Sequence, residues 1–301
     1  MKRRDLLKST VAMAAATTVA PRSRAADGAP IMRRVPSSGE ELPIVGLGTS
    51  QTFEVGVADV ERAPLRRVLA TFFAAGGRVV DTSPMYSTAE QVLGDLLTPE
   101  MHAHAFLATK VWTRGARAGT EQMTRSAQLL GARQLDLIQV HNLLDLDTQL
   151  ATLREWKAAG RVRYVGVTHY TVAAHADLER VLAREPLDFV QLNYSPVTRA
   201  AERRLLPLAA ERGVAVLVNR PFEDGELFAA TRGKPLPPWA ADIDASSWGQ
   251  LILKFIAGHP AVTCIIPATA RLAHLEDNLA GGRGRLPDAS QREQIARLLN
   301  S

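Results

Sequence analysis

The sequence predicts an α/β protein, a (β/α)8 TIM barrel that is entered through an N-terminal β-hairpin. Short runs rich in Val, Ile and Leu recur eight times from residue 43 onward, and longer segments of helical period alternate with them. Runs that are apolar on both faces are typical of buried parallel strands, and parallel strands need crossover helices between them. No linker, low-complexity tract or run of charge divides the chain. We therefore expect residues 30–301 to form a single barrel.

The first expected elements are the hairpin and the strand that follows it. SSGEE is a turn signal that separates IMRRV from ELPIV within residues 30–45. Because this hairpin precedes the first barrel strand, we expect it to plug the floor of the barrel. The eight strand-like runs are PIVGLG from Pro43, RVVD from Arg78, AFLATKV from Ala105, LDLIQVH from Leu135, RYVGVT from Arg163, DFVQLNY from Asp188, VAVLVN from Val214 and VTCIIP from Val262.

Amphipathic helices are expected between these runs. Residues 63–75 and 148–159 each place their large apolar side chains on one face at helical spacing. Gly76, Gly160 and Gly213 follow three such segments, at the position where a left-handed residue ends a helix. An open doubly wound sheet is the competing fold. It is disfavoured because no GxGxxG turn opens the first helix.

The N-terminus has the pattern of a targeting segment. Lys2, Arg3 and Arg4 precede a short Ala/Thr/Val run, and small residues surround Ala25, where a signal peptidase would cut. Adjacent arginines are typical of the twin-arginine signal, which exports folded proteins. We expect residues 1–25 to be a cleaved twin-arginine type signal peptide, recognised by the twin-arginine export machinery, and the mature protein to be periplasmic. The alternative is a basic N-terminus that stays attached.

Without this segment the chain is electrically balanced. The whole chain has 36 Lys+Arg and 31 Asp+Glu; residues 1–25 hold six of the former and one of the latter, which leaves 30 of each. A net charge near zero gives no argument for binding nucleic acid or for a membrane-bound mature form. Cys264 is the only cysteine, so no intramolecular disulfide can form. We expect a monomer.

Ionisable side chains stand at the ends of three consecutive runs. Asp81 follows RVV, Lys110 lies in FLATKV and His141 follows LIQV, while Tyr86 lies in the loop after Asp81. In a TIM barrel the active site lies at the carboxyl ends of the strands. We therefore expect these four side chains to meet at one mouth.

The four residue types fit one task. A lysine inside an apolar strand is costly to bury unless it is paired, and Asp81 is the nearest candidate partner. A neighbouring ammonium stabilises a phenolate, which makes Tyr86 a candidate general acid. His141 can hydrogen-bond a carbonyl oxygen and orient it. Each residue alone also has a structural explanation, such as a helix cap, surface packing, a solvated strand end or a core histidine; together they favour catalysis.

These motifs resemble one family, the aldo/keto reductases, which are NAD(P)H-dependent (β/α)8 barrels. ELPIVGLGT, GGRVVDTSPMYSTAEQVLG, FLATKVW and LDLIQVHN are similar to the family's entry strand and to its Asp/Tyr, Lys and His segments, and the likeness runs from about residue 41 to 280. The resemblance implies a catalytic tetrad of Asp81, Tyr86, Lys110 and His141. It also implies the cofactor NADP(H), with NAD(H) less expected.

The resemblance also implies a set of cofactor-binding residues. GVTH, QLNYS and VLVNRPF match segments at the nicotinamide end, the last with an asparagine where the family often has an aromatic ring, a role that Phe222 would then fill. IPATARLAHLEDNLA matches the segment at the adenosine end, where Arg271 would face a ribose 2′-phosphate. The implied cofactor-binding residues are Thr168, His169, Gln191, Asn219, Pro267, Thr269, Arg271, Asp277 and Asn278.

Two further residues are expected to line a substrate pocket. Met85 and Trp112 flank the implied tetrad, which suits an apolar or aromatic carbonyl compound. His102 and His104 form an HxH pair, but they precede FLATKV at the base of a strand, away from the expected mouth and with no cysteine nearby. We therefore expect no metal site.

The first functional hypothesis is an NADPH-dependent oxidoreductase that reduces an aldehyde or ketone to an alcohol. In it Tyr86 is the general acid, Lys110 and Asp81 tune Tyr86, and His141 orients the carbonyl. A second hypothesis uses Lys110 as the Schiff-base nucleophile of an aldolase or isomerase. A third is a nucleotide-binding sensory or scaffold barrel with little turnover, motivated by His169 and Asn219.

Overall fold

The computed structural model describes residues 28–300; the signal peptide predicted for residues 1–25 lies outside the described residues. Eight parallel strands form one sheet in the sequential order β3 to β10, so the predicted α/β barrel is confirmed. All eight predicted runs supply a strand. The barrel strands are β3 (Leu47–Gly48), β4 (Val79–Asp81), β5 (Phe106–Val111), β6 (Leu135–His141), β7 (Val162–Thr168), β8 (Phe189–Asn193), β9 (Ala215–Asn219) and β10 (Val262–Ile265).

The barrel closes where its first and last strands meet. Parallel bridges join Val45 to Ile265 and Gly48 to Ala268. The close approach explains the glycine in this strand, because a Cβ on Gly48 would lie 2.7 Å from the carbonyl oxygen of Ile266. The run predicted from Pro43 is therefore only partly a regular strand, and isolated bridges complete the closure.

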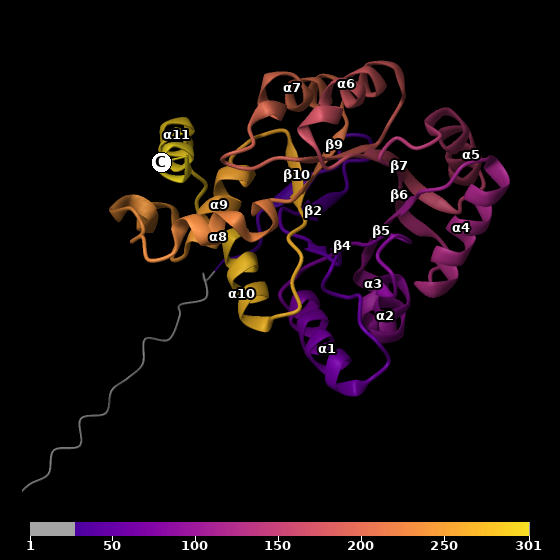
Figure 1. Ribbon diagram of the computed structural model, residues 1–301, viewed down its shortest axis with the longest axis horizontal. Coiled ribbons are helices and arrows are strands. Elements are labelled where there is room, and N and C mark those ends of the chain that lie inside the picture. The colour runs from indigo at the N-terminus through magenta and orange to yellow at the C-terminus, as the bar shows by residue number, and fades with distance from the viewer. Residues whose placement is uncertain (1–27, 301) are drawn as a thin grey trace, which may run out of the picture.

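Helices surround the strands on the outside (Figure 1). Those predicted over residues 63–75 and 148–159 are present as α1 (Asp59–Ala74) and α5 (Leu146–Ala158). The other helices are α2 (Ala89–Leu96), α3 (Pro99–His104), α4 (Ala116–Leu129), α6 (His175–Arg184), α7 (Leu205–Glu211), α8 (Glu226–Thr231), α9 (Trp248–Ala257), α10 (Leu272–Gly281) and α11 (Ala289–Leu299), with 3₁₀ turns η1 (Val172–Ala174), η2 (Ala200–Arg203), η3 (Glu223–Gly225) and η4 (Pro238–Ile243). Within residues 28–300 no helix combines the length and hydropathy needed to cross a membrane.

Three helices end as their sequences predict. Gly76, Gly160 and Gly213 have φ values of 85°, 69° and 65°, in the left-handed region where glycine carries little steric cost. Each of these glycines turns the chain from the end of a helix toward the next strand.

The N-terminal hairpin covers the floor of the barrel. Strands β1 (Met32–Arg34) and β2 (Glu41–Pro43) pair antiparallel. Leu42 is fully buried in the same apolar cluster as the side chains inside the barrel. The Tyr164 hydroxyl donates to Ser38 Oγ at 2.7 Å, and Glu40 forms ion pairs with arginines at the amino ends of β4 and β7. The hairpin thus closes the end of the barrel opposite to the carboxyl ends of the strands.

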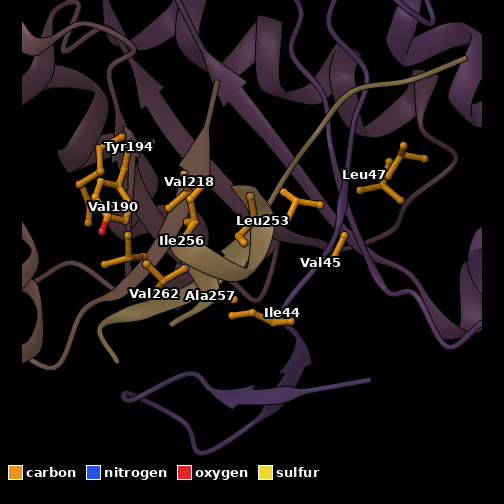
Figure 2. Packing of buried hydrophobic residues seen from close by; sticks show 14 of the residues in the cluster. Ile44, Val45, Leu47, Val190, Tyr194, Val218, Leu253, Ile256, Ala257 and Val262 are labelled. Carbon is orange, nitrogen blue, oxygen red and sulfur yellow. The ribbon is translucent and has the colours of Figure 1, made fainter. Parts of the chain in front are cut away.

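Two apolar cores hold the strands in place. The larger core lies between the sheet and the helices; Figure 2 shows Leu253 and Ile256 of α9 near Val218 of β9 within it. The smaller core fills the barrel interior, and it includes Cys264, which is 0% exposed. Side chains at alternate strand positions point to opposite faces, which assigns one set to each core.

Candidate active site

A polar layer sits directly on the inner apolar core. Every second residue of a strand points into the barrel, so the residue two places after an inner-core side chain also faces inward. The polar layer consists of five such residues, each two places after an inner-core residue: Asp81 after Val79, Lys110 after Ala108, Gln139 after Leu137, Gln191 after Phe189 and Asn219 after Leu217. The strand period therefore carries polar groups to the carboxyl end of the barrel, where a site is expected.

Asp81 and Lys110 form a buried ion pair at the centre of this layer. Lys110 Nζ donates to Asp81 Oδ2 at 2.7 Å and to the carbonyl oxygen of Thr82 at 2.8 Å, and the two side chains are 0% and 3% exposed. Burial alone would lower the pKa of Lys110, but the Asp81 carboxylate and Tyr86 outweigh it and raise that pKa. Lys110 is thus held as a cation.

Two glutamines complete the environment of the Asp81 carboxylate. Gln191 Nε2 donates to Asp81 Oδ1 at 2.9 Å, and Gln139 Nε2 donates to the same oxygen at 3.3 Å. Both glutamines are buried. Each oxygen of Asp81 therefore has at least one donor, which orients the carboxylate toward Lys110.

Tyr86 and His141 lie beside the ion pair, as the sequence predicts. Lys110 Nζ is 5.0 Å from the centroid of the Tyr86 ring. The rings of Tyr86 and His141 have centroids 6.4 Å apart and are nearly perpendicular. The structure therefore brings Asp81, Tyr86, Lys110 and His141 to one place, although they come from three strands and a loop.

The ring of His141 is neutral over a wide pH range. Burial, with Lys110 and His169 nearby, lowers the pKa of His141 to about 3. Its Nδ1 lies 3.5 Å from Ser83 Oγ. A neutral imidazole has one N–H donor and one acceptor nitrogen, so it can donate one hydrogen bond without carrying charge.

The residues expected at the nicotinamide end lie on the next three strand ends. Thr168 Oγ1 donates to Gln191 Oε1 at 3.1 Å, and Asn219 Nδ2 donates to the same oxygen at 3.2 Å. His169 Nδ1 accepts from the backbone N–H groups of Tyr170 and Thr171, which leaves the proton of a neutral ring on Nε2. Thr168, Gln191 and Asn219 are thus joined to the Asp81 carboxylate by hydrogen bonds.

The residues expected at the adenosine end follow β10. Pro267 and Thr269 lie in the turn before α10, and Thr269 Oγ1 accepts from the N–H of Arg271 at 3.0 Å. Arg271 is exposed at the start of α10. Asp277 accepts hydrogen bonds from Ser247 and Gln250 of the α9 segment, both at 2.7 Å.

The residues of this adenosine segment come from other elements than the ion pair of the polar layer. Asn278 is buried in α10, next to Asp277 in the sequence. The adenosine-end residues lie in the turn after β10 and in α10, whereas Asp81 and Lys110 lie on β4 and β5.

Large exposed apolar side chains flank the mouth. Met85 is 38% exposed and Trp112 is 40% exposed, each close in sequence to an ion-pair residue. Phe222 packs against Phe228 with ring centroids 4.7 Å apart. Met85 and Trp112 are thus available to an apolar ligand, whereas Phe222 is engaged in an aromatic pair.

A hollow of about 450 Å³ opens beside His169, between the loop after β6 and helix α6. Asn142 and Arg180 contribute to its wall, and Arg180 is already paired with Asp177. Among residues 28–300 no group of three or more His, Cys, Asp or Glu side chains could hold a metal ion.

Three further groups contribute to the site and were not predicted from the sequence: Gln139, Ser83 and the carbonyl of Thr82. Gln139 stands two residues before His141 in a strand whose other central residues are apolar, and that polar break at the inward-facing period was a usable signal. The carbonyl of Thr82 and the hydroxyl of Ser83 had no such signal, because their roles depend on how the chain turns after β4.

Comparison with known proteins finds relatives that match about two thirds of the chain. The chain is 31% identical over 216 residues to an aldo-keto reductase from Mycobacterium sp. (strain KMS), covering 67% of this chain and 71% of that one. It is 25% identical over 232 residues to the NADH-specific methylglyoxal reductase of Escherichia coli (strain K12), covering 65% and 69%.

A solved structure and a family model extend the likeness. An aldo-keto reductase from Klebsiella pneumoniae, determined in complex with NADPH, superimposes with a TM-score of 0.71 at 24% identity, over 89% of this chain and 95% of that one. The model of the aldo/keto reductase family matches residues 44–298. The eight-stranded barrel, its polar layer and a match over most of the chain lead to one conclusion: this chain belongs to the aldo/keto reductase family of oxidoreductases.

Proposed function

We propose that this protein reduces an aldehyde or ketone to an alcohol with NADPH as hydride donor. The observation that carries the proposal is the buried Lys110 cation, bound to Asp81 at 2.7 Å and 5.0 Å from the centre of the Tyr86 ring. A fixed cation beside a phenol favours loss of the phenolic proton. The Tyr86 hydroxyl is then a proton donor at the mouth of the barrel, where a small molecule can reach it.

Proton delivery is the task of Tyr86. As the carbonyl oxygen gains negative charge, the Tyr86 hydroxyl donates its proton to it, and the Lys110 ammonium stabilises the phenolate that remains. Asp81 holds Lys110 in place and keeps it protonated. His141, neutral because its pKa is lowered to about 3, donates a hydrogen bond to the carbonyl oxygen and orients it.

The cofactor fits the polar atoms of the mouth. Asn219 Oδ1 is a buried acceptor without a partner, and Arg271 is exposed at the start of α10, where a 2′-phosphate could be met. Bound NADPH supplies the hydride that is added to the carbonyl carbon. The NADPH complex of the Klebsiella relative supports this choice, and the NADH-specific relative from E. coli makes NADH the alternative to test.

The geometry disfavours the Schiff-base hypothesis. An amine attacks a carbonyl only when it is unprotonated. The pKa of Lys110 is raised, since Asp81 and Tyr86 outweigh the lowering effect of burial, and its Nζ already has two acceptors. A barrel that binds nucleotide without turnover is the remaining alternative, and the Tyr86 experiment below separates it from a reductase.

The test replaces the proposed acid. Tyr86→Phe should lower kcat for NADPH oxidation with a panel of apolar and aromatic aldehydes and ketones by roughly 10²- to 10⁴-fold, the usual contribution of general acid catalysis. Tyr164→Phe at the barrel floor is the matched control and should keep full activity. Equal turnover of wild type and Tyr86→Phe would refute the role of Tyr86. Binding of NADPH by a wild type that reduces none of the compounds would favour the binding-only barrel.

The proposal extends to the place of action. The basic N-terminus with Arg3 and Arg4 supports export by the twin-arginine route, which carries folded proteins. A folded precursor can bind its cofactor before export. The periplasmic protein would then carry NADP(H) from the cytoplasm, and bound nucleotide in purified periplasmic protein is the expected observation.

A further inference from the structure

The side chain of Gln191 has no hydrogen-bonding capacity left for a ligand. A glutamine amide offers two N–H donors and two acceptor sites on its oxygen. Nε2 donates to Asp81 Oδ1 at 2.9 Å and to Gln139 Oε1 at 3.4 Å, while Oε1 accepts from Thr168 and Asn219 at 3.1 and 3.2 Å. Gln191 is 2% exposed. It therefore acts as a bridge within the protein.

Asn219, in contrast to Gln191, still has a free hydrogen-bond acceptor. Its Nδ2 donates to Gln191 Oε1 and, at 3.3 Å, to the backbone oxygen of His169, whereas its Oδ1 is buried without a partner. The two acceptors settle which way the amide faces, because a reversed amide would place Oδ1 against two oxygens. The free Oδ1 is thus a fixed acceptor at the carboxyl end of β9.

The next residue, Arg220, also has a buried polar atom without a hydrogen-bond partner. Arg220 has a φ of 49°, in the left-handed region, and its Nε is buried without a partner. Strained backbone and unpaired buried polar atoms tend to occur where a ligand completes the structure. Both features coincide at the end of β9.

We infer that Asn219 Oδ1 accepts a hydrogen bond from the carboxamide NH₂ of the nicotinamide, and that Gln191 positions Asn219 instead of binding the cofactor itself. The inference rests on the proposed use of NADP(H). The carboxamide supplies the N–H donor that a buried acceptor lacks. The contact also links the cofactor through Asn219 and Gln191 to the Asp81 carboxylate, and so to Lys110.

The experiment compares two ligands that differ at the carboxamide. In 3-acetylpyridine adenine dinucleotide phosphate a methyl group replaces the NH₂, so the oxygen stays and the donor is lost. Calorimetric titration of the full chain should show that wild type binds NADP⁺ roughly 3- to 10-fold more tightly than this analogue, as expected for one net hydrogen bond. Asn219→Leu, which has similar volume and no acceptor, should bind the two ligands equally.

The matched control is Asn142→Leu. Asn142 also follows a barrel strand and also has a buried Oδ1 without a partner, but it lies in the wall of the hollow beside α6. This variant should keep the wild-type ratio of the two dissociation constants. Circular dichroism checks that each variant folds, and Asn219→Ala takes the place of the leucine variant if that one does not, with the same expected loss of discrimination.

Two outcomes overturn the inference while leaving the proposed function intact. One is an Asn219 variant that binds both ligands more weakly by the same factor, so that the ratio is preserved. The other is a wild type that binds NADP⁺ and the analogue equally. A wild type that binds no NADP⁺ would remove both the inference and the NADP(H) dependence on which it rests.

Discussion

At the scale of single residues, the chemistry depends on a charge pair that is almost wholly buried. Lys110 and Asp81 are 0% and 3% exposed, and their partners are carbonyl and amide groups of the protein. Removing one member of such a pair leaves an uncompensated buried charge. The residues that are proposed to tune the acid are therefore also residues on which the fold depends.

The first prediction concerns this pair. Lys110→Met and Asp81→Asn should each lower the free energy of unfolding by about 3–5 kcal/mol, because each leaves the other group without its partner. The double variant should cost less than the sum of the two, as is found for residues in direct contact. Urea unfolding followed by circular dichroism measures all three variants.

The control for this cycle is a pair on the surface. Arg117 and Glu121 lie four residues apart on α4 and are 92% and 63% exposed. Their coupling should be about 0.5 kcal/mol or less, since water screens exposed pairs. Strictly additive costs for Lys110 and Asp81 would contradict the account of a coupled buried pair.

The second prediction concerns pH. Burial, with Lys110 and His169, lowers the pKa of His141 to about 3, whereas an unfolded histidine titrates near 6.5. Between these values only the unfolded chain takes up the proton, so falling pH favours unfolding by up to about 1.4 kcal/mol per pH unit. This contribution is complete above the unfolded value and is lost as the pH falls.

The measurement is the free energy of unfolding at about pH 7 and about pH 5, in wild type and in His141→Gln. The variant should lose less stability than wild type over this interval, because it has no proton to take up at this position. His104→Gln, which changes an exposed histidine on α3, should behave as wild type. Identical pH dependence in wild type and His141→Gln would contradict a neutral buried ring.

At the scale of elements, the two ends of the barrel have separate tasks. The amino ends pack on the hairpin β1–β2 through the inner core, and the carboxyl ends carry the polar layer. Leu42 of the hairpin belongs to the floor, and Asp81 to the mouth. A change at one end should therefore leave the other end undisturbed.

The third prediction follows from this separation. Leu42→Ala should lower the free energy of unfolding by about 2–5 kcal/mol, because a fully buried leucine leaves a cavity in the inner core. The dissociation constant for NADP⁺ should not change in the folded variant. Met32→Ala in the same hairpin is the control, since Met32 is 40% exposed and such surface changes alter stability by about 0.5 kcal/mol or less. Weaker NADP⁺ binding by Leu42→Ala would show that floor and mouth are coupled.

Elements differ in how far their sequences predict them. β6 was predictable because LDLIQVH is apolar on both faces, and α1 because its apolar side chains repeat at helical spacing. β3 is shorter than the run PIVGLG indicates, because closure of the barrel uses isolated bridges at Val45 and Gly48. Closure depends on contacts between residues more than 200 positions apart, which no local pattern contains.

At the scale of the whole molecule, the site was predictable in part for a related reason. Ionisable residues that end apolar runs, such as Lys110 and His141, stand out in a sequence because burial makes them costly. Gln139 and Gln191 stand out less: each is a polar break in an apolar strand, but an amide in a strand has many uses. The Gln191 amide uses both of its N–H donors and both acceptor sites of its oxygen. This can be seen only when β4, β6, β7 and β9 are assembled around it.

The fourth prediction concerns export of the whole chain. Changing Arg3 and Arg4 together to lysine should retain the protein in the cytoplasm of a Gram-negative host, because the twin-arginine machinery recognises the arginine pair. Arg22→Lys, outside the pair, is the control and should be exported normally. Fractionation with immunodetection measures the distribution. Undiminished periplasmic protein in the Arg3/Arg4 variant would contradict the proposed route.

The buried position of Cys264 makes the folded protein resistant to oxidation at its thiol. Burial, with Asp81 nearby, raises the pKa of this thiol, and its side chain is 0% exposed inside the barrel. Oxidants attack the thiolate, and they must reach it. Because the chain has no other cysteine, no accessible thiol can form a sulfenic acid or a disulfide-linked dimer. The folded protein therefore needs no reductant to prevent disulfide bonds between copies of the chain, in whichever compartment it works.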